Sequence, residues 1–248
     1  MNSIMLCEGS TDYAILQYYM ARVNNWHDGK SGKFKYREHN KVYKSRTLLR
    51  NGDELTIAAV GGCGNLKKGL VSVLDSNCIS APDQTDVYNK IVILTDRDET
   101  STEESFISDI LEAFKMYSVA AESTLENNKW VSCKMPNSFG ENIDFQILFL
   151  IVPFYEKGAL ETFLLNAVAN EDDYDAQIVS QCSRFVDTTD TERKYLTKRR
   201  YITKAKFDAF FCIRTAAEQF EERQSILKNV PWENYQTVQE CFSLLGEL

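Results

Sequence analysis

Apolar positions along the first 153 residues follow two alternating patterns, and together these patterns predict an α/β core. Short apolar runs with the length and β-branched character of buried strands lie at residues 3–7, 54–60, 90–95, 129–134 and 145–152. Segments with a helical spacing of apolar positions lie at residues 11–23, 65–75 and 103–117. Strands that alternate with helices predict a mostly parallel sheet flanked by helices.

The pattern changes after Pro153, where no further convincing strand follows. Helical segments are expected at residues 158–169, 173–185, 202–227 and 233–246. We therefore predict an α/β core of residues 1–153 and a helical C-terminal part of residues 154–248 that packs on it. The stretch 187–199 is polar and charged, and its threonines interrupt any apolar period, so we expect a loop there that closes over a substrate.

Acidic residues directly follow the first and third predicted strands. Glu8 and Asp12 bracket the turn after the first strand, and Asp96 and Asp98 follow the third. Parallel strands end at one edge of a sheet, and two residues of an extended Asp-x-Asp share one face. Clustered carboxylates repel one another unless a cation lies between them, and such hard oxygen ligands suit Mg²⁺ or Mn²⁺. The pattern predicts a divalent-metal site.

Asp12 and a glycine-rich run at residues 61–64 have structural explanations as well. Asp12 taken alone fits the start of a helix as well as it fits a metal site, although capping needs neither the Asp-x-Asp nor the Glu-Gly. The run Gly61-Gly62-Cys63-Gly64 lacks the Gly-Lys-Ser/Thr ending and the Gly-x-Gly-x-x-Gly spacing of nucleotide-binding loops. We interpret these glycines as allowing a tight turn close to the metal site or to a phosphate.

Three motifs carry a resemblance to a known domain, and they occur in the order Leu6-Cys7-Glu8-Gly9-Ser10-Thr11-Asp12, Ala59-Val60-Gly61-Gly62-Cys63-Gly64-Asn65-Leu66 and Ile91-Val92-Ile93-Leu94-Thr95-Asp96-Arg97-Asp98. They resemble the Toprim domain, the metal-binding α/β module of topoisomerases, primases and OLD-family nucleases. Residues 153–161, Lys204 and Pro231-Trp232-Glu233 are further similar to small standalone Toprim proteins of the OLD-like group. The resemblance spans most of the chain.

The resemblance implies a Toprim fold, one or two bound ions and specific roles for six residues. The implied metal ligands are Glu8, Asp12, Asp96, Asp98 and Glu161, with Asp12 and Glu161 completing a second metal position. Glu8 would also act as general acid or base, and Lys204 would contact phosphate. Glu161 has a structural alternative as a helix N-terminal glutamate that interacts with the helix dipole. Full-length OLD proteins carry an ATPase domain that is not evident here, so a separate ATPase partner is an expectation.

Charge is distributed unevenly along the chain. The net charge is −8, which by itself argues against nucleic acid as a partner. Residues 29–50 and 193–206, however, together hold fifteen basic residues and one acidic residue, so they carry +14 and the remainder carries −22. Such segments can bind a phosphate backbone, or they can be solvated surface. The predicted nucleic-acid-binding residues are Lys33, Lys35, Arg37, Lys198, Arg199, Arg200 and Lys206. Interleaved tyrosines favour nucleic acid slightly, because aromatic rings stack on splayed bases.

Composition restricts the class of protein further. A chain of 248 residues with 44% hydrophobic content can bury a substantial core. Seven cysteines, an odd number without a Cys-x-x-Cys pair, favour a reducing cytoplasm, and we expect Cys7, Cys63, Cys133 and Cys212 to be buried thiols. The N-terminus shows no signal-peptide pattern, and the longest apolar run is far shorter than the roughly 20 residues of a membrane span. Two histidines offer little for a hydrolase triad or a histidine zinc site.

We therefore expect a cytoplasmic Mg²⁺- or Mn²⁺-dependent endonuclease that hydrolyses phosphodiesters of DNA or RNA. The OLD-like resemblance adds antiviral defence as an expected role. A non-catalytic binding module with a Toprim fold and a primase-like nucleotidyl transferase are the alternatives. The complete acidic set argues against the first, and the lack of a zinc module or a nucleotide-binding loop argues against the second.

Overall fold

The computed structural model describes residues 1–29, 44–80, 86–99, 101–216, 227 and 230–248. In this part of the chain, eight strands form one sheet in the order β2-β3-β4-β1-β5-β8-β7-β6. The strands are β1 (Asn2–Cys7), β2 (His27–Asp28), β3 (Lys44–Arg50), β4 (Asp53–Ala59), β5 (Tyr88–Asp96), β6 (Ala120–Ala121), β7 (Trp130–Pro136) and β8 (Asn142–Val152). The predicted Lys33, Lys35 and Arg37 lie outside the described residues.

The four central strands of the sheet are parallel, and the outer strands are antiparallel. β1 pairs in parallel with β4 and β5, and β5 pairs in parallel with β8. β2, β3, β6 and β7 extend the two sides of the sheet in antiparallel pairs. The α/β fold class is confirmed, because every apolar run predicted to be a strand belongs to this sheet. The central strands read as continuous apolar runs because both of their faces are covered.

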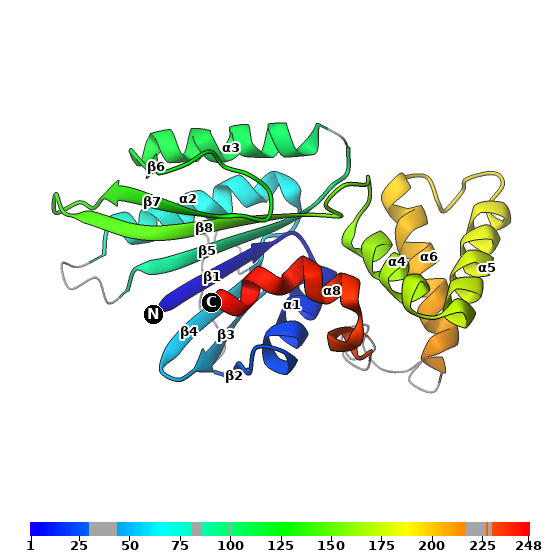
Figure 1. The fold of residues 1–248 in the computed structure, drawn as a ribbon. Coiled ribbons are helices and arrows are strands. Elements are labelled where there is room, and N and C mark those ends of the chain that lie inside the picture. The colour runs from blue at the N-terminus through cyan, green and yellow to red at the C-terminus, as the bar shows by residue number, and fades with distance from the viewer. Residues whose placement is uncertain (30–43, 81–85, 100, 217–226, 228–229) are drawn as a thin grey trace.

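Helices cover the two faces of the sheet (Figure 1). α2 (Leu66–Cys78) and α3 (Thr102–Met116) lie on one face, where they enclose Ile4, Leu6, Ile91 and Ile93. α1 (Ser10–Arg22) and the C-terminal α8 (Gln236–Phe242) lie on the other, over Met5, Val92 and Leu94. Successive residues of each strand thus alternate between two apolar cores, as the period of two requires.

A group of three helices lies beyond the carboxyl ends of the central strands (Figure 1). These helices are α4 (Leu160–Glu171), α5 (Asp173–Thr189) and α6 (Arg199–Arg214). Phe163, Phe207 and Phe210 from this group join the same buried cluster as α1 and α8. The C-terminal part is helical, as predicted, whereas the boundary at residue 153 stays a prediction.

Some details of the sequence interpretation were wrong. Residues 44–50 are not among the predicted strands, but they form β3. Only Leu48 of this strand is fully buried, and the strand holds two adjacent leucines among charged and hydroxyl-bearing residues, so no apolar alternation marks it. The predicted loop 187–199 begins later, because α5 continues to Thr189. Cys7 and Cys133 are buried as expected, whereas Cys63 and Cys212 are exposed.

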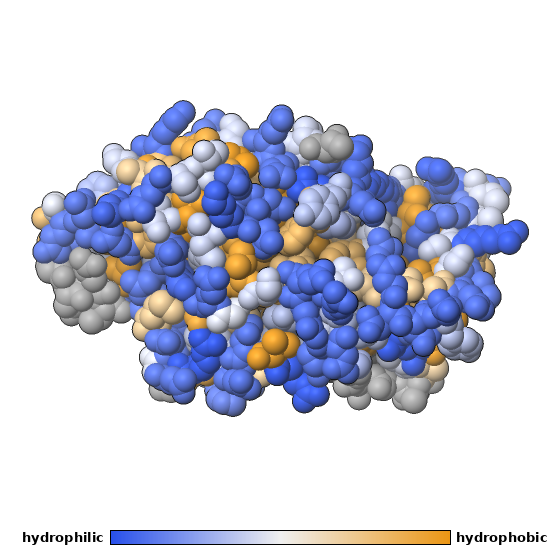
Figure 2. All heavy atoms as spheres, in the orientation of Figure 1, coloured by the Kyte–Doolittle hydropathy of each residue, from blue (hydrophilic) through white to orange (hydrophobic). Residues whose placement is uncertain are grey.

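The surface is mixed in character. Figure 2 shows hydrophilic side chains over most of the face that is turned to the viewer, with apolar patches between them. In the described part of the chain, no helix combines the length and the apolar character that would let it cross a membrane.

Candidate functional site

The candidate site lies at the carboxyl ends of the central strands, where the chain connections run to opposite faces of the sheet. The helix after β1 covers one face, and the helix between β4 and β5 covers the other. At such a point the carboxyl ends of neighbouring strands leave a crevice in which open α/β sheets bind their ligands. Here a cavity of about 360 Å³ opens between these strand ends and the three-helix group. It is lined by Glu8, Gly9, Ser10, Thr11, Asp12, Gly61, Gly62, Cys63, Asp96, Asp98, Ala159, Glu161, Arg199, Arg200, Thr203 and Lys204.

Glu8 follows β1 directly and is held from both sides. The N–H groups of Gly61 and Gly62 each donate to the main-chain oxygen of Glu8 at 2.9 Å. These two glycines have φ values of 80° and 119°, a backbone region that favours glycine. The side-chain Oε1 of Glu8 accepts from the hydroxyl of Thr95 and, at 3.1 Å, from the N–H of Asp96. The glycine-rich turn is tight, as the sequence interpretation expected, and it holds the backbone of Glu8.

Asp12 and Asp96 each hold the start of a helix. Asp12 stands in the first turn of α1, and its Oδ2 accepts from the N–H of Gly9 at 2.7 Å. Oδ1 of Asp96, at the end of β5, accepts from the N–H of Leu160 at 2.8 Å, where α4 begins. Asp12 therefore does take part in capping α1, as the structural explanation states. Both carboxylates nevertheless line the cavity, and Asp12 is only 6% exposed.

Glu161 reaches the same cavity from the first turn of α4. Its side chain is 5% exposed, and its Oε1 lies 2.6 Å from Nζ of Lys204 on α6. The hydroxyl of Thr11 donates to the same oxygen at 3.1 Å. This places three separate elements, α1, α4 and α6, around one buried carboxylate. Glu161 therefore stands at a helix N-terminus, as the structural alternative states, but its side chain is buried and faces the cavity.

Burial and mutual repulsion change the proton affinities of these carboxyl groups. Burial, then the negative charges of Asp12 and Glu8, raise the pKa of Asp96 to about 9. Burial raises the pKa of Asp12 to about 7, with additional repulsion from Glu8 and Glu161. Burial also raises the pKa of Glu8, against the hydrogen bonds from Thr95 and Asp96. Such shifts arise when several acids share a site of low dielectric constant.

The pKa of Glu161 moves in the opposite direction. Burial alone would raise it, but the hydrogen bond and the positive charge of Lys204, helped by the bond from Thr11, bring it below the ordinary value. Glu161 is therefore ionised and paired at neutral pH. The Lys204 ammonium provides this corner of the cavity with the positive charge that a metal ion would otherwise supply.

The donor set fits a hard divalent cation in chemistry, but the ligands are not assembled around a common centre. Among the described residues, no group of three or more His, Cys, Asp and Glu side chains is arranged so that it could hold a metal ion. Each of the four inner carboxylates instead accepts from donors of its own: Glu8 from Thr95, Asp12 from Gly9, Asp96 from Leu160, and Glu161 from Thr11 and Lys204. The metal site thus stays a prediction from the sequence.

Asp98 and Arg199 form the outer rim of the cavity. Asp98 is exposed, and Arg199 at the start of α6 donates to its main-chain oxygen at 2.8 Å. Arg199 also lies 3.2 Å from a carboxylate oxygen of Glu99. Both aspartates of the Asp-x-Asp therefore face one cavity, as their spacing predicted.

Arg97, between the two aspartates, is buried and fixes the loop before α4. Its Nε donates to the main-chain oxygen of Pro153 at 2.8 Å, and its guanidinium pairs with Glu103 at 2.8 Å. Its main-chain oxygen accepts from the N–H of Gly158 at 2.8 Å. These contacts join the end of β5 to the loop that carries Glu161 into the cavity.

Only some of the predicted basic residues line the cavity. Arg199, Arg200 and Lys204 line the cavity. Lys198 stands just before α6, and its Nζ lies 6.0 Å from the centre of the Tyr201 ring. Lys206 instead pairs with Asp187 on α5 at 2.8 Å and does not belong to the cavity lining. The basic side of the site is therefore the first turns of α6.

Four uncharged or weakly polar residues of the site were missed from the sequence. Thr11, Thr95 and Thr203 contact or line the carboxylate cavity, and the exposed Cys63 lies beside Glu8 and Asp98. A threonine adjacent to an acidic motif is too common in sequences to indicate a role. The available signal for Cys63 was its place in the glycine-rich turn, which separates it from the apolar run.

The fold and the cavity define the class of protein as a mixed α/β protein with a carboxylate-lined cavity at the carboxyl edge of its sheet. The chain belongs to the family described as "Protein of unknown function (DUF3226)", whose model matches residues 2–242. It is also similar to a solved structure, hypothetical protein PH0156 from Pyrococcus horikoshii OT3, with a TM-score of 0.50 and 15% sequence identity over 98% of this chain and 99% of that chain. At this identity the likeness shows the fold alone. The search of curated proteins found no match.

Proposed function

We propose that this protein is a Mg²⁺- or Mn²⁺-dependent nuclease of the Toprim type that hydrolyses phosphodiester bonds in nucleic acid. The observation that supports this proposal is the composition of the cavity. Carboxylates at the carboxyl ends of β1 and β5 and in the first turns of α1 and α4 form one side, and cationic side chains of α6 form the other. A divalent cation and a phosphate group are together complementary to these two sides.

The residues on α6 are spaced to face a phosphate together. Arg200, Thr203 and Lys204 are separated by three and four positions, so they share one side of the helix. An arginine, a hydroxyl and an ammonium are groups that bind phosphate oxygens in proteins. On this proposal, Lys204 exchanges its pairing with Glu161 for a phosphate oxygen when a substrate enters, because its side chain is 46% exposed and free to move outward.

The carboxylates have distinct proposed roles. Glu8, Asp12, Asp96, Asp98 and Glu161 would hold the cation. When bound, one or two Mg²⁺ or Mn²⁺ ions would polarise the phosphoryl group and lower the pKa of a coordinated water. The raised pKa of Glu8 lets this side chain hold and release a proton closer to neutral pH than an ordinary glutamate, which suits a general acid or base.

A second candidate is a nucleic-acid-binding module without catalysis. The observation that favours it is the separate hydrogen bonding of the carboxylates, which leaves no assembled ligand group among the described residues. The two candidates differ in one respect that can be measured. Hydrolysis requires a divalent cation and the carboxylates, whereas binding through α6 requires neither.

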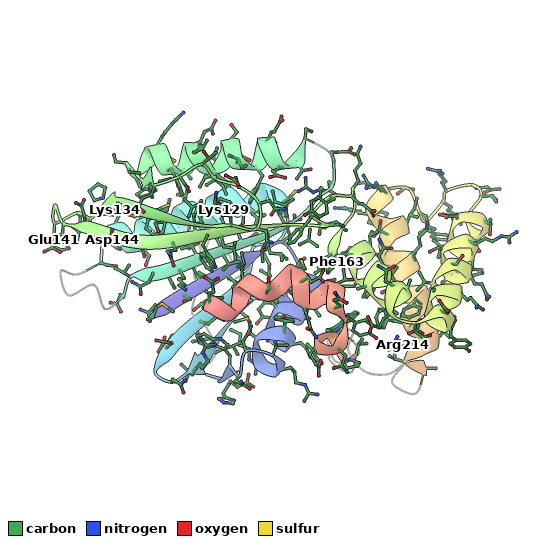
Figure 3. All side chains as sticks on the ribbon, in the orientation of Figure 1. Lys129, Lys134, Glu141, Asp144, Phe163 and Arg214 are labelled. Carbon is green, nitrogen blue, oxygen red and sulfur yellow. The ribbon has the colours of Figure 1, made fainter. Side chains whose placement is uncertain are left out.

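The test is incubation of the purified protein with plasmid, single-stranded DNA and tRNA in Mg²⁺, Mn²⁺ or EDTA. We expect cleavage with either ion and none in EDTA, and we expect Asp98→Ala to abolish it. Asp144→Ala is the matched control, because Asp144 is also an exposed carboxylate and lies near the start of β8, at the end of the strand away from the cavity (Figure 3). Equal activity of Asp98→Ala and wild type, or no cleavage of any substrate by wild type, would reject the nuclease proposal.

A further inference from the structure

We infer that the substrate is single-stranded, and that Tyr195 and Tyr201 are stacking sites for bases on either side of the phosphate held in the cavity. This inference rests on the proposed function and assigns its substrate class. It is carried by the loop between α5 and α6 and by the first turn of α6, residues 190–201. In this segment, exposed aromatic rings lie among cations, and its last two cations, Arg199 and Arg200, line the cavity.

Tyr195 is displayed on a loop with a defined structure. The residue is 71% exposed, and Nζ of Lys194 lies 5.2 Å from the centre of its ring. The carboxylate of Asp190 accepts from the N–H groups of Lys194, Tyr195 and Leu196 at 3.0, 2.8 and 2.7 Å. Three hydrogen bonds to one carboxylate fix the loop backbone. The exposed fraction of Tyr195 shows that its ring does not pack into a core.

Tyr201 directly follows Arg200, which lines the cavity. The residue is 37% exposed, and Nζ of Lys198 and the guanidinium carbon of Arg200 lie 6.0 and 5.1 Å from the centre of its ring. Arg200 also donates to the Tyr201 hydroxyl at 3.3 Å. Tyr201 therefore contacts a residue of the cavity wall opposite the carboxylates.

The combination of rings and cations favours single strands over duplexes. A base in a single strand has free faces that stack on a tyrosine, whereas the bases of a duplex are stacked on one another and show only their edges. Lysine and arginine beside each ring complement the phosphates that connect successive bases. A duplex would contact the same cations but would leave the rings without partners.

Charge complementarity decides the class of partner. The loop and first turn of α6 are basic, within a chain of net charge −8, and their cations lie next to a cavity that contains Arg199, Arg200 and Lys204. An acidic protein segment would match the cations but would offer few flat aromatic groups to the rings. A polyanion with regularly spaced planar groups matches both.

The experiment measures fluorescence anisotropy of labelled DNA and RNA oligonucleotides, single-stranded and duplex with the same sequence, in EDTA. The variants are Tyr195→Leu and Tyr201→Leu, with Tyr195→Phe and Tyr201→Phe to retain the ring. Tyr174→Leu is the matched control, because Tyr174 is also 71% exposed but lies near the far end of α6, where Arg214 pairs with Asp175 (Figure 3).

We expect tighter binding of single strands than of duplexes. Each leucine variant should lose roughly 5- to 100-fold in affinity for single strands, with duplex affinity unchanged, while the phenylalanine variants and Tyr174→Leu bind like wild type. The salt dependence should be unchanged in the tyrosine variants and smaller in Arg200→Ala, since only the arginine neutralises a phosphate. The DNA and RNA arms identify the sugar.

Equal affinity for duplex and single strand, or leucine variants that bind like wild type, would overturn the inference. The same loss in Tyr174→Leu would also overturn it. A parallel incubation with Mn²⁺ separates this result from the proposed function. Ring-dependent binding without cleavage would reject the nuclease proposal and retain the stacking sites. Equal cleavage of duplex and single strand would retain the nuclease proposal and reject the stacking sites.

Discussion

Replacing Asp96 with asparagine tests the electrostatics of the cavity without a substrate. Burial, with repulsion from Asp12 and Glu8, raises the pKa of Asp96 from 3.8 to about 9. Asparagine has nearly the same shape, and its amide oxygen can still accept from the N–H of Leu160, which is now 2.8 Å from Oδ1. The substitution therefore removes the ionisable group and retains the start of α4.

The direction of the effect follows from the raised pKa. The folded state binds the Asp96 proton more tightly than the unfolded state, so its contribution to stability is fully present below pH 3.8 and is lost as the pH rises toward about 9. Each pH unit within this window corresponds to about 1.4 kcal/mol for one group. Between pH 5 and pH 8, the wild type should therefore lose about 4 kcal/mol from Asp96 that the asparagine variant does not lose.

The assay is urea unfolding in EDTA at pH 5, 6.5 and 8. We expect the free energy of unfolding of Asp96→Asn to exceed that of wild type at pH 8, with the difference shrinking toward pH 5. Asp144→Asn is the control, since it removes a carboxylate that pairs with Lys134 at 3.7 Å far from the cavity (Figure 3). An identical pH dependence of stability in Asp96→Asn and wild type would refute the reasoning.

Three further perturbations test individual contacts. Lys204→Met should lower the free energy of unfolding by about 1–3 kcal/mol at pH 8 and by less at pH 4. The lowered pKa of Glu161 reflects a stabilising pair with Lys204, and this pair is lost as the acid is protonated. Urea unfolding at both pH values measures the loss, and an equal loss at both would contradict the prediction. Arg97→Lys should lower the free energy of unfolding by about 1–3 kcal/mol, because the single ammonium of lysine cannot donate to both the Pro153 oxygen and Glu103 as the guanidinium does. An unchanged thermal unfolding temperature would show that these contacts do not stabilise the loop. Cys63 should react with a thiol reagent before the buried cysteines do, and its reaction should slow once Mn²⁺ is added. Mass spectrometry follows the modification. A reaction rate that does not depend on Mn²⁺ would show that the ion does not bind beside Cys63.

The α/β core could be predicted because its strands are fully buried. β1, β5 and β8 are apolar on both faces, and their runs are visible without any knowledge of pairing. β3 could not be found in this way, because it pairs beside the outermost strand and keeps most of its side chains partly exposed. The two-residue strands β2 and β6 exist only through pairing with a neighbour, which no local pattern records.

The carboxylates of the candidate site could be predicted for a different reason. Glu8 and Asp96 follow strands that proved adjacent and parallel, so the topology brought them to one cavity. Glu161 comes from far along the chain, and its place depended on the resemblance, since the loop fixed by Arg97 determines where α4 begins. Lys206 shows the limit of counting charges, because its helix face turns it toward Asp187 and away from the cavity.

Equilibrium binding of Mn²⁺, followed through the paramagnetic resonance signal of the free ion, tests the central claim most directly, because it requires neither substrate nor turnover. The account predicts saturable binding to wild type and to Asp144→Ala, and a decrease in affinity of about tenfold or more in Asp98→Ala. Absence of saturable binding to wild type, or equal affinity of wild type and Asp98→Ala, would contradict a metal site at the carboxyl edge of this sheet.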